Sequence, residues 1–248
     1  SDLETPGFRL VAASEASGHA ALGRDAGELA ELAALGVPVD QDSDALFAVS
    51  DAVLDFTLPG ATEGHSASAA RHGTALIIGT TGLEAEQQSA LEKAGQKAAI
   101  VQAPNMSLCV NLLMRLAEQA AALLDEDYDI EIVEMHHRHK VDAPSGTALL
   151  LGEAAAQGRG VDLAEQSERG RDGHTGARQE GAVGFASLRG GTVAGEHSVI
   201  LAGEEERLTL SHSAENRSIF ARGAVRAAEW MLAREPGRYT MEEVLGLQ

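Results

Sequence analysis

The first hundred residues alternate short apolar runs with segments of helical character. The apolar runs, bounded by Gly, Pro and Thr, are residues 8–13, 53–56, 75–78 and 98–102. Residues 26–35 and 84–96 lie between them and have the composition of helices. Apolar strands that alternate with helices predict a parallel sheet covered on both faces. Ligands of such sheets bind beyond the carboxyl ends of the strands.

Small polar residues follow three of these predicted strands. They are Asp55-Phe56-Thr57, Gly79-Thr80-Thr81 and Pro104-Asn105-Met106-Ser107. A rim of this composition is typical of a nucleotide site, but ordinary strand-to-helix turns have it too. Both interpretations stay open on these residues alone.

The second half has a different pattern. A long helix, mostly apolar, is predicted over residues 107–124 as a buried connector. Residues 129–137 follow as a strand, with Ile130, Ile132 and Met135 expected on one face and Glu131 and Glu134 on the other.

Beyond a polar, glycine-rich loop at residues 158–181, three more strands are predicted. They cover residues 182–188, 196–202 and 207–212, and Arg189-Gly-Gly-Thr192 is the predicted turn between the first two. We expect a mostly antiparallel open sheet whose exposed face pairs with another copy of the chain. Residues 219–233 are predicted to form an amphipathic helix that returns to the first domain.

Composition narrows the class of protein. A chain of 248 residues with 44% hydrophobic residues is expected to be globular. Its formal net charge of -19 argues against nucleic acid and anionic membranes as partners. No apolar run approaches the roughly 18 residues of a membrane span, and no secretory signal is recognisable, so we expect a cytoplasmic protein. Cys109, the only cysteine, excludes an intramolecular disulfide and is expected in the core.

A basic cluster interrupts this acidic chain. His136 to Lys140 are five consecutive residues that can carry positive charge, and Ser145-Gly146-Thr147 follows as a helix start. Helix starts bind anions through free N–H groups, and His and Lys exchange protons near neutral pH. We therefore favour an active site for a small anion. A metal site is disfavoured because His136 and His137 would point to opposite faces of a strand, and a purely structural role stays open as a further alternative.

Several segments in order carry a family resemblance. Glu134-x-His-His-x-x-Lys-x-Asp-Ala-Pro-Ser-Gly-Thr-Ala148 resembles the signature of the 4-hydroxy-tetrahydrodipicolinate (dihydrodipicolinate) reductases of bacterial lysine and diaminopimelate synthesis. Further family-like segments are Asp25-Ala-Gly-Glu-Leu, Asp55-Phe-Thr, Ile78-Gly-Thr-Thr-Gly82, Asn105-x-Ser107, Gly173-His-Thr-Gly176, Gly195-Glu-His197 and Phe220-Ala-x-Gly-Ala224.

The resemblance implies a fold and a reaction. The fold is α/β: a Rossmann-like parallel-sheet domain, at residues 1–107 and 217–248, and a central α/β domain at 108–216 with an open sheet that builds a homotetramer. The reaction is reduction of a cyclic imine dicarboxylate by a nicotinamide cofactor. Carried over by position, His136 is the acid/base residue and Lys140 the proton donor, while His137, Gly146 and Thr147 bind a substrate carboxylate. The residues implied to line the nicotinamide are Gly79, Thr80, Thr81, Ala103, Pro104, Asn105 and Met106.

Two departures from the family pattern affect the cofactor. The glycine-rich phosphate loop and first strand, which the resemblance implies ahead of Ser1, are missing here, and we expect a truncated sequence to explain this. Glu15 is then placed to accept ribose hydroxyls, although spacing alone favours a surface residue there, since no G-x-G-x-x-G loop precedes it. Ala16 stands where many relatives have a basic residue that meets the 2′-phosphate of NADPH. We therefore predict NADH, with NADPH as the alternative.

Two other functions stay open. A relative that lost its phosphate loop could bind a small dicarboxylate without catalysis. A metal-dependent hydrolase is the third possibility.

Overall fold

Two compact units make up the computed structural model, which describes residues 7–247. Among these, the first unit comprises residues 7–106 and 220–246, and the second comprises residues 107–219 together with Leu247. No helix within the described part of the chain combines the length and the apolar character needed to cross a membrane.

The first unit is built on a parallel sheet of four strands in the order β11-β5-β4-β3. The strands are β3 (Ala52–Asp55), β4 (Ala75–Ile78), β5 (Ala99–Gln102) and β11 (Gly237–Tyr239). All four residues of β4 are buried, as expected for a central strand covered on both faces. The predicted parallel sheet is confirmed, and β11, which the sequence pattern did not reveal, adds an edge strand from the C-terminal segment.

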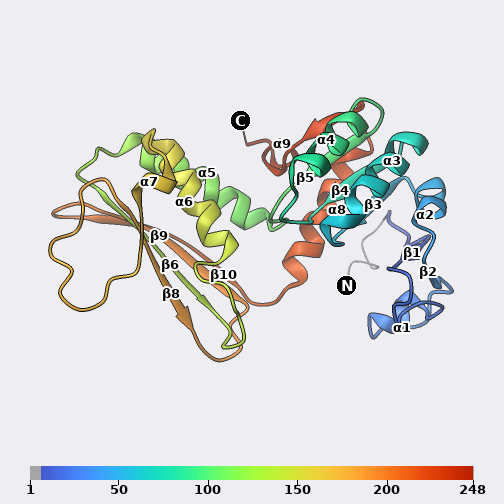
Figure 1. Ribbon diagram of the computed structural model, residues 1–248, viewed down its shortest axis with the longest axis horizontal. Helices are drawn as coiled ribbons and strands as arrows, with labels where there is room; N and C mark the ends of the chain where they lie inside the picture. Colours follow the sequence, from blue (N-terminus) through green and yellow to red (C-terminus); the bar gives the residue numbers. More distant parts are fainter. Residues whose placement is uncertain (1–6, 248) are drawn as a thin grey trace. The chain divides into compact units, whose positions relative to one another are not determined.

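Helices cover this sheet (Figure 1). They are α2 (Ser43–Val49), α3 (Thr62–His72), preceded by the 3-10 turn η2 (Pro59–Ala61), α4 (Ala85–Ala94), α8 (Ser218–Met231) and α9 (Met241–Leu245). Phe47, Ala69 and Leu91 bring α2, α3 and α4 onto Leu76 and Ile78 in one core. At the start of α8, a side chain at Gly223 would collide with the carbonyl oxygen of Met106, so only glycine allows this close approach.

A separate pair of short strands lies in the same unit. β1 (Ala13–Ser14) and β2 (Val39–Asp40) pair in parallel and do not join the four-stranded sheet. A cavity of about 360 Å³ separates β1 from β3 and is lined mainly by apolar side chains, among them Leu10, Phe47 and Val53. The strand predicted over residues 8–13 is therefore wrong for residues 8–12, because a strand is defined by its pairing and these residues have no strand partner.

The helix predicted over residues 26–35 is also wrong beyond its first turn. Only α1 (Ala26–Leu29) forms. The Asp25 carboxylate caps it and also accepts hydrogen bonds from the backbone N–H groups of Leu35, Gly36 and Val37. These bonds close the segment into a loop, where the pattern of apolar residues had indicated a helix.

The second unit contains a five-stranded mixed sheet in the order β10-β9-β6-β8-β7. The strands are β6 (Asp129–His136), β7 (Ser167–Arg169), β8 (Val183–Arg189), β9 (Gly195–Ala202) and β10 (Arg207–Ala214). The pairs β10–β9 and β9–β6 are antiparallel, while β6–β8 and β8–β7 are parallel. The predicted open sheet is thus present, with antiparallel pairing on one side of β6 and parallel pairing on the other.

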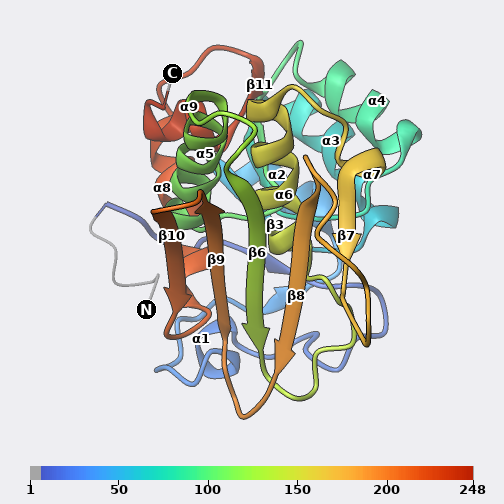
Figure 2. The same ribbon diagram turned by 90° about the vertical axis from the view of Figure 1, so that its left-hand side faces the viewer.

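Two long helices cover one face of this sheet, α5 (Leu108–Leu123) and α6 (Gly146–Arg159). Figure 2 shows the sheet nearly face-on, with both helices behind it. Ile130, Ile132 and Phe185 pack against the helices in a common core. Gly152 allows α6 to approach closely, because a Cβ there would lie 2.5 Å from the Phe185 ring.

Strand β6 lies between β8 and β9, so these two strands do not form a hairpin. The segment that joins them passes around the end of β6: the N–H groups of His137 and Arg138 donate to the carbonyls of Val193 and Gly191, and Gly190 donates to the carbonyl of His136. The predicted turn is therefore a wider connection that supports the basic cluster.

Two smaller expectations also need correction. The segment predicted as a loop over residues 158–181 contains the end of α6, the short helix α7 (Leu163–Gln166) and β7. Cys109 is exposed on α5, so it is not the core residue that its chemistry predicted.

Candidate active site

A buried carboxylate stands at the end of β6. Burial alternates strictly along this strand, so Glu134 and His136 share the helix-covered face with Ile130 and Ile132. The expected grouping of Glu134 with Glu131 was therefore wrong, because the two-residue period of a strand overrides the polarity of the side chain. Glu134 is 1% exposed, on a strand face whose two preceding buried positions are isoleucines.

Glu134 is held by donors from three different segments. Arg189, at the end of β8, donates from its two terminal nitrogens to the two carboxylate oxygens, each at 2.8 Å. His136 Nδ1 lies 2.6 Å from Oε2, and the Ser145 N–H donates to Oε1 at 3.2 Å. Burial raises the pKa of Glu134, but hydrogen bonds from Arg189, His136 and Ser187 outweigh it and bring the pKa to about 2. The carboxylate is therefore ionised at neutral pH.

Lys140 lies on the loop between β6 and α6. Its Nζ lies 2.8 Å from the Asp142 carboxylate, and its side chain is mostly covered. Arg189 also donates to the Asp142 carbonyl, which ties this loop to the end of β8. The structure thus brings His136, His137 and Lys140 onto adjacent positions at one end of the sheet.

The helix start follows directly. Ser145 is the N-cap of α6, and its Oγ accepts from the Ala148 N–H. Gly146 and Thr147 lie in the first turn, where the positive end of the helix dipole favours anions. Two independent anion-binding devices, cationic side chains and a helix start, therefore occur on one short stretch of chain.

His197 is a member of this site that sequence reasoning left without a role. It comes from β9, its ring meets the His136 ring edge-on with centroids 5.0 Å apart, and its Nε2 lies 3.1 Å from Ser145 Oγ. Burial and then the proximity of His136 lower the pKa of His197 to about 4, against the opposing effect of Glu134. The sequence offered one indication of His197, because the segment Gly195-Glu-His197 resembles the family. The sequence did not indicate that this segment pairs with β6 and so brings His197 next to His136.

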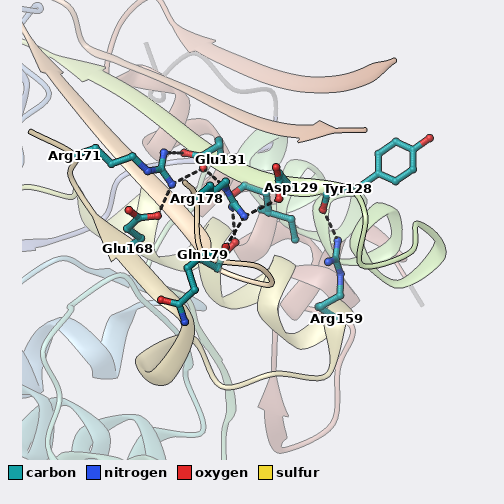
Figure 3. A network of polar contacts seen from close by, with 10 residues as sticks. Tyr128, Asp129, Glu131, Arg159, Glu168, Arg171, Arg178 and Gln179 are labelled. Carbon is teal, nitrogen blue, oxygen red and sulfur yellow. Dashed lines mark hydrogen bonds and ion pairs between the residues drawn. The ribbon is translucent and has the colours of Figure 1, made fainter. Parts of the chain in front are cut away.

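A second polar cluster occupies the other face of the same strand. Glu131 binds Arg171 through both carboxylate oxygens at 2.8 and 3.0 Å, and its Oε1 also accepts from Arg178 Nε at 2.8 Å. Arg178 also donates to Asp129 and to three backbone carbonyls, and Arg171 donates to Glu168 (Figure 3). This cluster ties the glycine-rich segment to the sheet and contains no histidine. Among residues 7–247, no group of three or more His, Cys, Asp or Glu side chains is arranged to hold a metal ion.

The residues predicted to line the cofactor lie at the carboxyl edge of the first unit's sheet. Gly79 donates to the Asp55 carbonyl, Ala103 donates to the Ile78 carbonyl, and the Thr80 hydroxyl donates to the Thr57 carbonyl. These bonds join the ends of β3, β4 and β5 into one rim. The Phe56 ring lies where a side chain of residue 79 would be, so a larger residue there would have to displace this exposed ring.

The rim residues differ in exposure. Thr81 and Pro104 are exposed, whereas Ala103, Asn105 and Met106 are buried behind them. Glu15 directly follows β1 and is exposed, and its carboxylate accepts from the Ala16 N–H at 2.7 Å. Glu15 therefore stands at the end of a parallel strand, as an acidic residue for ribose hydroxyls would.

A parallel dinucleotide-type sheet and a second, mixed-sheet unit with titratable side chains at the end of β6 are the architecture of two-domain α/β oxidoreductases. Family models support a finer assignment. One described as "Dihydrodipicolinate reductase, N-terminus" matches residues 3–106, and one described as "Dihydrodipicolinate reductase, C-terminus" matches residues 109–245. The chain belongs to the dihydrodipicolinate reductase family, which confirms the resemblance.

Curated relatives agree with this assignment. The chain is 58% identical over 245 residues to a 4-hydroxy-tetrahydrodipicolinate reductase of Sinorhizobium medicae, covering 98% of this chain and 90% of the relative. It is 56% identical over 243 residues to 4-hydroxy-tetrahydrodipicolinate reductase 1 of Mesorhizobium japonicum, covering 98% and 89%. A solved structure, the dipicolinate-bound dihydrodipicolinate reductase of Paenisporosarcina sp. TG-14, superposes with a TM-score of 0.76 at 25% identity, covering 98% and 91%. This superposition confirms the fold class.

Proposed function

We propose that this protein reduces 4-hydroxy-tetrahydrodipicolinate, a cyclic imine dicarboxylate, to tetrahydrodipicolinate with a nicotinamide nucleotide, in lysine and diaminopimelate biosynthesis. The observation that carries the proposal is the buried Glu134–His136 pair beside Lys140 and the α6 start. The names of the curated relatives and the dipicolinate bound to the solved relative support the same substrate class.

The second unit supplies the binding and proton-transfer groups. The first turn of α6, with Gly146 and Thr147, and the side chains of His137 and Lys140 hold the substrate carboxylates. Loss of the 4-hydroxyl group as water converts the substrate to a conjugated imine. Addition of a hydride to that imine leaves negative charge on the ring, which must be quenched by a proton. Lys140 Nζ donates that proton, and His136 exchanges protons at the same end of the sheet.

The first unit holds the cofactor. Its rim offers the small side chains, hydroxyls and backbone groups that a nicotinamide nucleotide binds, at the sheet edge where such ligands bind: Gly79, Thr80, Thr81, Ala103, Pro104, Asn105 and Met106. The nicotinamide supplies a hydride when bound.

The cofactor is NADH in preference to NADPH. Glu15 offers a carboxylate to the ribose hydroxyls, and Ala16 offers no positive charge to a 2′-phosphate. The ratio of kcat/KM for NADH to kcat/KM for NADPH tests this, with Ala16→Arg as the variant that should move the ratio towards NADPH. A clear NADPH preference in the unmodified protein would refute it.

The protein works as a homotetramer in the cytoplasm. The face of the mixed sheet opposite α5 and α6 carries Val133, Met135, Ala186 and Leu188 side by side, and Leu188 is half exposed. An apolar sheet face of this kind is stabilised when a second copy covers it. Light scattering after gel filtration tests the assembly, and Leu188→Glu should yield smaller species; a monomeric unmodified protein would contradict the assembly.

Two measurements separate the reductase from a binding protein without catalysis. Oxidation of NADH in the presence of substrate should be observed by the loss of its near-ultraviolet absorbance, and calorimetric titration should show binding of both pyridine-2,6-dicarboxylate and NADH. Binding of the dicarboxylate without NADH binding or turnover would favour the non-catalytic alternative. Metal-dependent hydrolysis would require stoichiometric metal in the purified protein.

A further inference from the structure

We propose that Glu134 is a positioning residue that fixes the tautomer of His136 and leaves Nε2 as the nitrogen that exchanges protons, with Arg189 as the counter-charge that keeps Glu134 ionised. This inference rests on the proposed function for its catalytic consequence. Its structural part, the tautomer, can be measured on the protein without substrate.

The position of Glu134 requires a specific explanation. A carboxylate in a core position loses hydration, and this costs several kcal/mol unless other groups replace the lost water. Its neighbours on the same strand face, Ile130 and Ile132, are buried apolar residues. An apolar side chain at residue 134 would avoid that cost, so the carboxylate has a role that an apolar residue could not fill.

The hydrogen bonds define that role. An ionised carboxylate only accepts hydrogen bonds, so the nitrogen of His136 that faces it must carry a hydrogen. The 2.6 Å contact to Nδ1 therefore places the proton on Nδ1 in the neutral ring. Nε2 then carries the lone pair, and it is the atom that can gain or lose a proton. The same logic fixes the imidazole in enzymes whose buried carboxylate orients a catalytic histidine.

Arg189 makes this arrangement stable. Its paired contacts to both oxygens of Glu134 keep the carboxylate ionised, and the Ser145 N–H adds a donor from the helix start. Glu134 therefore links β6, β8 and the first turn of α6. A shift in any of these three elements would therefore change the position of the His136 ring.

The surroundings of Nε2 also fit this role. A Cβ at residue 195 would lie 3.1 Å from His136 Nε2, so Gly195 leaves room beside that nitrogen. The titratable groups that contact the ring are Glu134 from β6 and His197 from β9. Arg189 from β8 binds Glu134, and Lys140 and His212 act electrostatically on His197. His197 stays neutral at neutral pH, because burial lowers its pKa and so disfavours its charged form.

The same strand offers a matched control. Glu131 is also a glutamate of β6 and is also bound by arginine, through three hydrogen bonds from Arg171 and Arg178, but it lies on the opposite face and bonds to no histidine among the contacts described. Glu131→Gln therefore removes an equivalent charge from the same strand without removing the acceptor from His136.

Nitrogen-detected proton correlation spectra of the histidine side chains test the proposal. In the unmodified protein, the neutral ring of His136 should be protonated at Nδ1 alone. Glu134→Gln should give a mixture of tautomers and lower kcat by at least about 10²-fold, with KM changed by less than about threefold. Glu134→Asp should recover part of kcat, and Glu131→Gln should leave the tautomer as it was.

Two results would overturn the proposal. One is an unmodified protein whose neutral His136 carries its proton on Nε2, which needs no variant and does not depend on how any variant folds. The other is a folded Glu134→Gln protein with an unchanged tautomer and unchanged kcat. Absence of reductase activity in the unmodified protein would count against the proposed function alone, because the tautomer is read without substrate.

Discussion

Glu134 and Glu131 lie on one strand, and both are bound by arginine. Glu134 faces the helices, is almost completely buried and holds a histidine, the end of β8 and the start of α6. Glu131 faces away from the helices, its side chain is 24% exposed, and it holds two arginines of the segment that leads to β8 (Figure 3).

The difference between the two carboxylates is one of environment. A partly hydrated ion pair contributes little and can be exchanged for other surface contacts. A dehydrated carboxylate must keep all its partners, since any partner removed leaves a buried charge uncompensated. The helix-covered face of β6 therefore carries the buried carboxylate and histidine, and the other face carries attachments of the chain to the sheet.

Lys140→Ala should give the largest effect. Loss of a positioned proton donor should lower turnover by on the order of 10²–10⁴ in a steady-state assay. Arg138→Ala, two residues earlier on the same loop, is the control and should retain turnover, because Arg138 is exposed. Near-normal turnover of Lys140→Ala would remove Lys140 from the mechanism.

The two glutamates should differ clearly in stability. Glu134→Gln should lower the free energy of unfolding by about 3 kcal/mol, because Arg189 loses a buried counter-charge. Glu131→Gln should lower it by about 1 kcal/mol or less, as expected for a partly hydrated network. Urea unfolding followed by circular dichroism measures both free energies. Equal losses would mean that the deeper burial of Glu134 does not make it more important for stability than Glu131.

Acid should destabilise the helix-covered face through His197. Its pKa falls from 6.5 to about 4 on folding, so its contribution is fully present above pH 6.5 and is lost as pH falls through 4. The loss amounts to about 3 kcal/mol for a shift of this size. His197→Gln should flatten the stability profile between pH 6.5 and 4. A variant profile as steep as that of the unmodified protein would contradict the assignment.

The smallest effects are expected from alanine at two glycines, one beside His136 and one beside Glu131. Gly195→Ala should place a Cβ against His136 Nε2 and lower kcat by about tenfold, with little change in the free energy of unfolding. Gly184→Ala would place its Cβ 2.1 Å from the Glu131 carboxylate, so it should displace Glu131 from its arginines and cost about 1 kcal/mol. Turnover and urea unfolding of both variants measure the contrast, and a reversed pattern would disprove it.

The local elements of this fold could be predicted because they depend on local patterns. The apolar run at residues 75–78 coincides with β4, and the Ser145-Gly146-Thr147 signal marks the start of α6. The family signature also predicted which titratable residues gather at the end of β6.

Long-range pairing could not be predicted in the same way. Nothing in the sequence around Arg189 indicates that β6 inserts between β8 and β9, because that order is decided by strands far apart in the chain. The loop around Asp25 depends on hydrogen bonds that reach as far along the chain as Val37. Glu134 was assigned to the wrong face because its polarity was given more weight than the two-residue period of a strand.

The connection between β8 and β9 has a consequence for redesign. It braces residues 136–138 through backbone groups alone, from the carbonyls of Gly191 and Val193 and the N–H of Gly190. These bonds hold the backbone at residues 137 and 138 without using the side chains of those two residues. Under the proposed function, substitutions at His137 and His139 should therefore alter ligand selectivity while the backbone beneath them is retained.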